Sequence, residues 1–135
     1  MFCLDTNVII FAMNSRRPAI KARLSQELRL GTNLIVPAIV RFELEFGIAK
    51  SDRPEQSRAS LDTLMAAGFE LPAFDRRDAA EAGDIRASLD ALGTPIGPYD
   101  ILIAAQARRR NAPLVTLNRH EFERVPGLMV TDWDA

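Results

Sequence analysis

Cysteine and histidine are almost absent from this 135-residue sequence, which has one of each, Cys3 and His120. A single cysteine excludes an intramolecular disulfide, and one histidine excludes a zinc site built on several cysteine or histidine ligands. No stretch approaches the roughly 18 consecutive apolar residues of a membrane span. The N-terminal residues also lack the basic region of a signal peptide, so we expect a cytoplasmic protein with no membrane contact.

Lysine is also scarce, because only Lys21 and Lys50 are lysines among 17 basic residues, and the formal net charge is −1. This balance disfavours a protein that binds nucleic acid through a strongly basic surface. Arginine is the better planar donor to phosphate, so a local phosphate-binding patch is compatible with the composition. The run 108–110 is a candidate RNA contact at the end of an expected helix. The nearby acids on another charged helix are expected to be solvated: Asp75, Asp78 and Asp84.

Apolar residues make up 47% of the chain, enough to form the core of one domain over residues 1–135. Short apolar runs predict strands near residues 2–5, 34–36, 69–74, 114–117 and 128–131. Helical patterns with proline near the start or glycine near the end predict helices near 15–30, 37–50, 54–67, 75–92 and 99–110, and a helical turn at 119–125. This alternation predicts an α/β fold with a mostly parallel sheet of four to five strands, flanked by helices.

Ligands of such a sheet bind at the carboxyl ends of its strands. Asp5 ends the first expected strand, and Thr6 follows it. Asn118 comes directly after the strand at 114–117. Each residue also has a purely structural interpretation, since Asp5 could only cap the next helix and Asn118 could only form a turn.

Two further acids lie on expected helices. On a helical wheel, Glu43 falls within a wide apolar arc, whereas Glu45 falls in the polar gap beside Arg41. A carboxylate on a buried face needs a partner, which could be a cation in a site or simply an arginine. Asp100 follows a Gly/Pro loop and starts a helix, where small alanines leave room for a ligand. Its structural interpretation is a favourable interaction with the helix dipole.

Taken together, Asp5, Glu43, Asp100 and Asn118 occupy positions that a parallel sheet would gather at one edge. Three neighbouring carboxylates repel one another strongly in a partly dry cleft. A hard divalent cation bound by oxygen ligands relieves that repulsion. The pattern therefore predicts a site for Mg²⁺, with Mn²⁺ as a substitute.

Several segments resemble the PIN-domain family, in particular VapC-type toxins of bacterial toxin–antitoxin pairs. Residues 4–10, LDTNVII, resemble the opening of these proteins, and residues 37–47, PAIVRFELEFG, resemble their second motif. Residues 93–107, GTPIGPYDILIAAQA, resemble the third motif, and 114–128, LVTLNRHEFERVPGL, the fourth. The similarity covers nearly the whole chain, in order and at the family's spacing.

The resemblance implies a metal-dependent endoribonuclease acting on structured RNA, such as transfer or ribosomal RNA. It implies that Asp5, Glu43 and Asp100 form the acidic cluster, and that Asn118 stands where many relatives carry aspartate. Asp5 and Asp100 would bind the metal, Glu43 would hold the attacking water, and Thr6 would add a hydroxyl contact. The resemblance also implies a cognate antitoxin as partner and a homodimer.

Two alternative functions stay open at this point. One is a PIN-like module that binds RNA or protein with weak catalysis or none, which the amide at Asn118 favours. The other is a phosphatase with an aspartate nucleophile, although such enzymes typically place a second acid two residues after the first, where this chain has Asn7.

Overall fold

A four-stranded parallel sheet lies at the centre of the computed structural model, which describes residues 1–134. The predicted domain of residues 1–135 extends one residue beyond this part. The sheet has the order β2-β1-β3-β4, with the strands β1 (Phe2–Leu4), β2 (Leu34–Ile35), β3 (Leu114–Val115) and β4 (Val130–Thr131). The predicted parallel sheet of an α/β fold is thus confirmed.

Helices make up most of the rest of the chain: α1 (Thr6–Asn14), α2 (Pro18–Arg29), α3 (Ala38–Lys50), α4 (Pro54–Met65), α5 (Arg76–Leu92), α6 (Pro98–Arg109) and α7 (Arg119–Phe122). Proline stands in the first turn of α2, α4 and α6, where its missing N–H has no helical partner to lose. The longest helix, α5, begins with a capping box at Asp75 and ends at Gly93, whose φ of 68° favours glycine.

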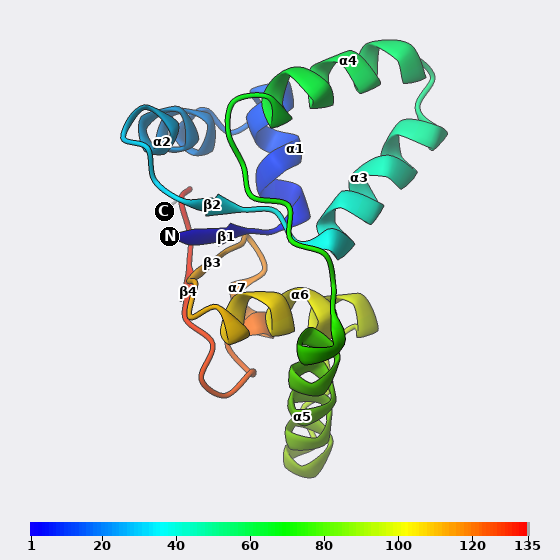
Figure 1. The fold of residues 1–135 in the computed structure, drawn as a ribbon, viewed down its shortest axis with the longest axis vertical. Coiled ribbons are helices and arrows are strands. Elements are labelled where there is room, and N and C mark those ends of the chain that lie inside the picture. Colours follow the sequence, from blue (N-terminus) through cyan, green and yellow to red (C-terminus); the bar gives the residue numbers. More distant parts are fainter. Residues whose placement is uncertain (135) are drawn as a thin grey trace.

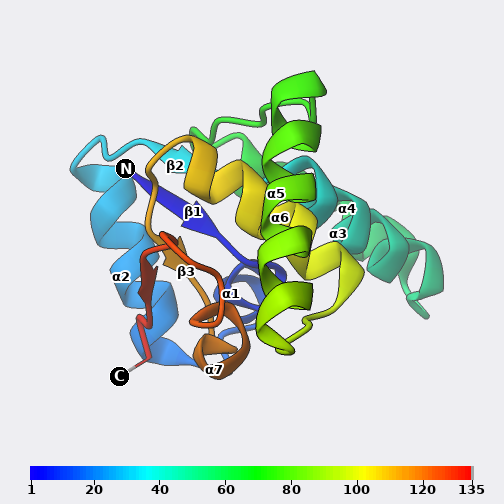
Figure 2. The same ribbon diagram turned by 90° about the horizontal axis from the view of Figure 1, so that it is seen from below.

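The sheet order explains how the helices form layers. The chain moves outward from β1 to β2 and then crosses back over β1 to reach β3. Right-handed crossovers in these two opposite directions place their helices on opposite faces of the sheet. Accordingly α2 lies on one side of the strands and α6 on the other, with α5 packed outside α6 (Figures 1 and 2). The sheet is the middle of three layers.

The central strand β1 is buried between these layers, and its Cys3 and Leu4 have no exposed surface. Its neighbours also contribute fully buried side chains, with Leu114 from β3 and Ile103 from α6. Asp5 directly follows this buried strand, so the core fixes the point from which its side chain extends. In residues 1–134, no helix is both long enough and apolar enough to cross a membrane.

Two predicted elements differ from the structure. The strand expected over 69–74 is reduced to one parallel bridge between Glu70 and Ile35, because Pro72 lacks the N–H that would continue the ladder. The helix expected from residue 15 starts only at Pro18. Ser15 has a left-handed backbone, with φ of 59°, and ends the separate helix α1.

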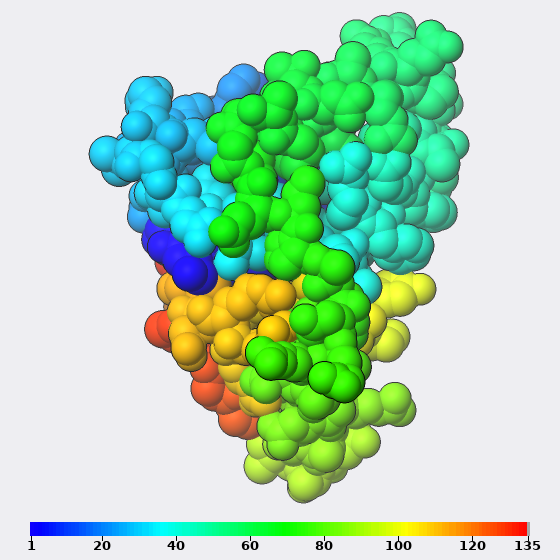
Figure 3. All heavy atoms as spheres, in the orientation of Figure 1, coloured from blue at the N-terminus to red at the C-terminus, as the bar shows by residue number. Residues whose placement is uncertain are grey.

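The apolar arc predicted for α3 is also buried only in part. Val40 and Leu44 lie in the core, whereas Phe42 is 49% exposed and Phe46 is 57% exposed. The reason is the position of the helix, since α3 and α4 form an arm that stands out from the sheet (Figures 1 and 3). Only one side of α3 therefore has neighbours to pack against.

Candidate active site

Asp5 lies where β1 ends and α1 begins, and only 8% of its surface is exposed. It caps α1, since its Oδ1 accepts a 2.8 Å hydrogen bond from the backbone N–H of Thr6. Its Oδ2 accepts a 2.7 Å bond from the hydroxyl of Thr116, just beyond β3. The structural role as a cap and a role in a site are thus compatible, because capping fixes the direction of the carboxylate.

Burial raises the pKa of the Asp5 carboxyl above its ordinary value. The hydrogen bonds from Thr116 and Thr6 favour the charged form and offset part of this effect, whereas the charges of Glu43 and Glu121 add to it. These influences show that the carboxylate faces other acids across a poorly hydrated space.

Glu43 reaches the same space from α3 and is partly buried. Its Oε1 accepts a 2.7 Å hydrogen bond from the hydroxyl of Thr6, so Thr6 donates to both acids, to Asp5 through its backbone N–H and to Glu43 through its side chain. A buried salt bridge to an arginine, the predicted alternative for Glu43, is not formed in the part of the chain that the structure describes. The acid of α3 that pairs with arginines is Glu45. It accepts from Arg41 at 2.9 Å and also from Arg58.

Asp100 stands in the first turn of α6 and is half-buried. Burial is the largest influence on its carboxyl, and the charges of Asp5, Glu121 and Glu43 act in the same direction. Together they raise its pKa to about 6. The preceding Gly97 leaves room for this group, because a Cβ there would lie 3.2 Å from Oδ2 of Asp100.

Glu121 is the acid of this cleft that the sequence-based prediction missed. It lies on α7, where its Oε1 accepts a 3.1 Å hydrogen bond from the N–H of Gly97. Its Oε2 accepts a 2.5 Å bond from the side-chain amide of Asn118. Asn118 itself is exposed, and its side chain holds Glu121. Glu121 comes three residues after Asn118, and side chains at this spacing are neighbours on a helical turn. This spacing could have indicated the pair from the sequence.

The site therefore gathers oxygen donors that lack a basic partner: within residues 1–134, no arginine or lysine forms an ion pair with Asp5, Glu43, Asp100 or Glu121. Such a donor set suits Mg²⁺ or Mn²⁺. In the same part of the chain, no three acid, histidine or cysteine side chains stand close enough to hold an ion. The site fits a divalent cation in donor type and charge, and to share one ion its carboxylates would have to move closer together.

The arginine run 108–110 is not part of this site. Arg108 contacts Glu81 at 2.5 Å and Asp84 at 2.7 Å, while Arg109 and Arg110 both pair with Asp78. Asp78 has no exposed surface, so the expectation that it is solvated is wrong. These arginines neutralise acids of α5, which explains why they are not free to form an RNA-binding patch.

The raised pKa of Asp100 predicts a specific pH dependence of stability without divalent cations. The carboxyl ionises near pH 3.8 when unfolded and near pH 6 when folded, so between these values the folded state holds the extra proton. The stability due to this group is present below about pH 4 and is lost as the pH rises to about 6. After allowance for its partial exposure, we expect a loss of the order of 1 kcal/mol.

Urea unfolding in EDTA between pH 4 and pH 7 measures this effect. The free energy of unfolding of Asp100→Asn serves as the reference, because acids remote from this site titrate equally in both proteins. Wild type should lose stability relative to Asp100→Asn across this range. Parallel pH profiles of the two proteins would show that Asp100 has an ordinary pKa.

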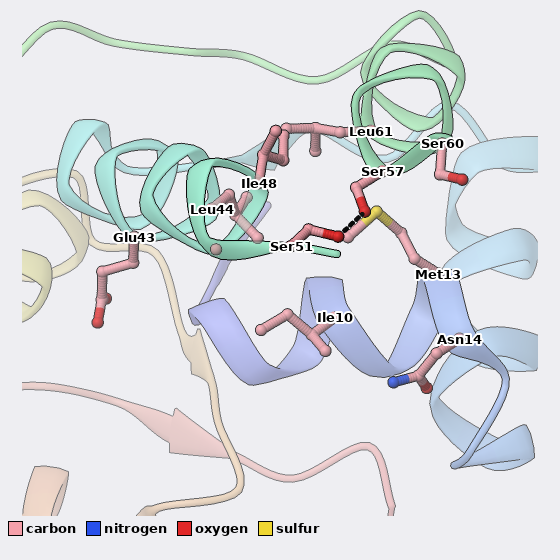
Figure 4. Close-up of a pocket in the computed structure, with 11 residues that line it drawn as sticks. Ile10, Met13, Asn14, Glu43, Leu44, Ile48, Ser51, Ser57, Ser60 and Leu61 are labelled. Atoms are coloured by element: carbon pink, nitrogen blue, oxygen red, sulfur yellow. Dashed lines mark hydrogen bonds between the residues drawn. The ribbon is translucent and has the colours of Figure 1, made fainter. Parts of the chain in front are cut away.

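An apolar groove lies beside the acidic cleft, between α1, α3 and α4 (Figure 4). Its volume is about 440 Å³, and its lining includes Ile10, Met13 and Ile48. Glu43 lies at one end of this groove, apart from the serines at the other end. A ligand in the groove would therefore approach one of the four acids directly.

Comparisons with known proteins agree with this geometry. Residues 2–128 match the PIN domain. The chain is 36% identical to the "tRNA(fMet)-specific endonuclease VapC" of Salmonella typhimurium, over 98% of this chain and 97% of the relative. It is 34% identical to "Ribonuclease VapC2" of Rickettsia felis, over 99% and 98% of the two chains. The solved structure of VapBC2 from Rickettsia felis bound to a promoter DNA fragment is similar, with a TM-score of 0.89, 31% identity and 98% of each chain covered.

Proposed function

Because this chain belongs to the PIN domain family, among the VapC-type ribonucleases of toxin–antitoxin systems, we propose that it hydrolyses phosphodiester bonds in structured RNA with a bound Mg²⁺ or Mn²⁺. The observation that carries this proposal is the set of four neighbouring acids without a basic partner. Burial first, and the charges of the neighbouring acids second, raise the pKa of Asp100 and Asp5, as expected for a site that a cation would stabilise.

Each polar residue of the cleft has a role in this proposal. Asp5 and Asp100 would hold the cation directly, and Glu43 would bind it through the attacking water, whose proton it would accept. Thr6 orients Glu43 through its hydroxyl, at 2.7 Å. When bound, the cation supplies a hydroxide-like nucleophile near neutral pH and stabilises negative charge on the phosphate. Asn118 would act through Glu121, because its side-chain amide donates to the Glu121 carboxylate. That carboxylate would complete the set of ligands around the cation.

We further propose transfer RNA as the preferred class of structured RNA, with ribosomal RNA as the second choice. The support is the relative from Salmonella typhimurium, which is named for its specificity for tRNA(fMet) and shares 36% of its residues with this chain.

The proposed protein partner is a cognate antitoxin. The support is the likeness to a VapBC complex and the groove that ends at Glu43. An apolar segment of the antitoxin would pack in the groove, and a basic side chain beside it would pair with the unneutralised acids.

The exposed rings of Phe42, Phe46 and Tyr99 support a homodimer as the second proposed assembly. Phe42 and Tyr99 touch edge to face, at 5.4 Å, and so form a continuous apolar patch on α3 and the start of α6. Light scattering of the purified chain measures its association state.

Removal of divalent cations tests the proposed chemistry. The purified chain, incubated with total tRNA and an excess of EDTA, should show no cleavage, because the cation supplies the nucleophile. Addition of Mn²⁺ or Mg²⁺ beyond the EDTA concentration should restore cleavage, which gel electrophoresis of the RNA detects. Cleavage that persists in EDTA would refute metal dependence. Binding of RNA without cleavage under all conditions would favour the non-catalytic module.

A further inference from the structure

A buried amide joins the two helices that carry Glu43 and Asp100. Gln106 lies on α6, six residues after Asp100, and has no exposed surface. Its Oε1 accepts a 2.8 Å hydrogen bond from the backbone N–H of Ala38, the first residue of α3. Glu43 follows five residues later on α3. This bond therefore ties the start of one acid-bearing helix to the middle of the other.

The bond replaces a helix cap that the local sequence does not provide. The first N–H groups of a helix have no partner within that helix. The residue before α3 is Pro37, which forms no side-chain capping bond. Gln106 thus supplies, from another helix, the acceptor that an N-cap residue ordinarily supplies.

The orientation of the amide is fixed by its other end. Nε2 of Gln106 donates to the carbonyl oxygens of Pro72 and Ala73, both at 3.3 Å, and lies 3.4 Å from Oδ2 of Asp78. Because Ala38 offers a donor and the other partners offer acceptors, only one orientation of the carboxamide satisfies them all. The Gln106 side chain therefore links α3 and α6 in a single orientation, and flipping its carboxamide would break these hydrogen bonds. We call this link the brace.

We propose that Gln106 is a positioning residue that sets the place of Glu43 relative to Asp100 and thereby the affinity of the cleft for a divalent cation. Glu43 lies about 7.5 Å along α3 from Ala38, and Asp100 lies about 9 Å along α6 from Gln106. Over such short lengths a helix moves as a rigid rod, so a shift at this bond moves Glu43 on α3 relative to Asp100 on α6. The inference rests on the proposed function, since it assumes that these acids bind the cation.

Binding of Mn²⁺ to the purified full chain, followed by electron paramagnetic resonance, tests the inference. Gln106→Met keeps the length of the side chain and removes both hydrogen-bonding ends. It should weaken Mn²⁺ binding about tenfold, the lower bound usual for residues that orient metal ligands. In a Glu43→Gln background the same substitution should have little further effect, because its influence passes through Glu43. A merely destabilising change would act equally in both backgrounds.

A second variant breaks the bond from its other end. Ala38→Pro suits the first position of α3 and replaces the N–H by a ring carbon, which ends the hydrogen bond and displaces the Gln106 carboxamide that lies 2.8 Å from this nitrogen. It should weaken Mn²⁺ binding to a similar extent, and it provides the test if Gln106→Met does not fold. Ile85→Val is the matched control, because it removes one buried methylene from α5 and should lower Tm without changing Mn²⁺ affinity.

The outcomes separate the inference from the proposed function. Unchanged Mn²⁺ affinity in Gln106→Met and Ala38→Pro would overturn the positioning role, as would an equal loss in the presence and absence of the Glu43 carboxylate. If wild type itself neither binds Mn²⁺ nor cleaves RNA, the proposed function fails and the inference falls with it. That failure is visible in wild type, before any variant is compared.

Discussion

Replacing Asp5 or Asp100 by asparagine should lower kcat/KM for RNA cleavage by about 10³-fold or more, because each substitution removes a charge that holds the cation at the reacting phosphate. The same substitutions should leave the free energy of unfolding unchanged or raise it. Burial raises the pKa of both carboxyls, so their ionised forms are less favourable in the folded protein than in water. A neutral amide of the same shape avoids this penalty.

Cleavage rates with tRNA and urea unfolding curves, both at pH 7.5, provide the two measurements. Asp62→Asn is the matched control, because it makes the same change of charge at an exposed position of α4 outside the cleft. It should retain full activity. Near-native cleavage by Asp5→Asn or Asp100→Asn would exclude these acids from catalysis, and a loss of activity that merely follows unfolding would make their role structural.

The second large effect is expected at Asp78, where truncation to alanine should destabilise the protein by about 3–5 kcal/mol. Its buried carboxylate accepts hydrogen bonds of 2.8 Å from Arg109 and 2.9 Å from Arg110, and also accepts the N–H of Asp75 at 3.0 Å. Its pKa is lowered to about 2, which shows that these donors outweigh the effect of burial. Alanine would leave two guanidinium groups near a buried site without their acceptor.

Asp84 provides the comparison for this substitution. It lies on the same helix and accepts a 2.7 Å hydrogen bond from Arg108, but its side chain is 68% exposed. Asp84→Ala should change the free energy of unfolding by less than about 1 kcal/mol, as is usual for exposed ion pairs. Equal effects of the two substitutions in urea unfolding would show that burial does not govern the strength of the Asp78 cluster.

Much of the fold could be predicted because local signals mark its elements. Proline at the start of α2, α4 and α6 and glycine after α5 identify their bounds, and short apolar runs identify the strands. The rule for strand ends points to Asp5, which the structure places directly after β1. Thr6 was predicted as a hydroxyl contact, and the structure places that hydroxyl on Glu43.

The parts that escaped prediction depend on contacts between distant segments. Helical periodicity shows that Phe42 and Phe46 share a face, but not that α3 stands out from the sheet and leaves this face exposed. Asp78 reads as a surface acid because the two arginines that surround it come from another helix. Glu121 escaped prediction because the rule for strand ends points to Asn118, near the end of β3, whereas the carboxylate comes one helical turn later.

The sheet order has a consequence for the timing of synthesis. β1 leaves the ribosome before its partner β3, which is encoded more than a hundred codons later, at Leu114–Val115. Thr116, which donates to Asp5, and the carboxylate of Glu121 follow later still. A nascent chain that ends before these residues has an incomplete acidic cluster, so the four acids can meet only after Glu121 has left the ribosome.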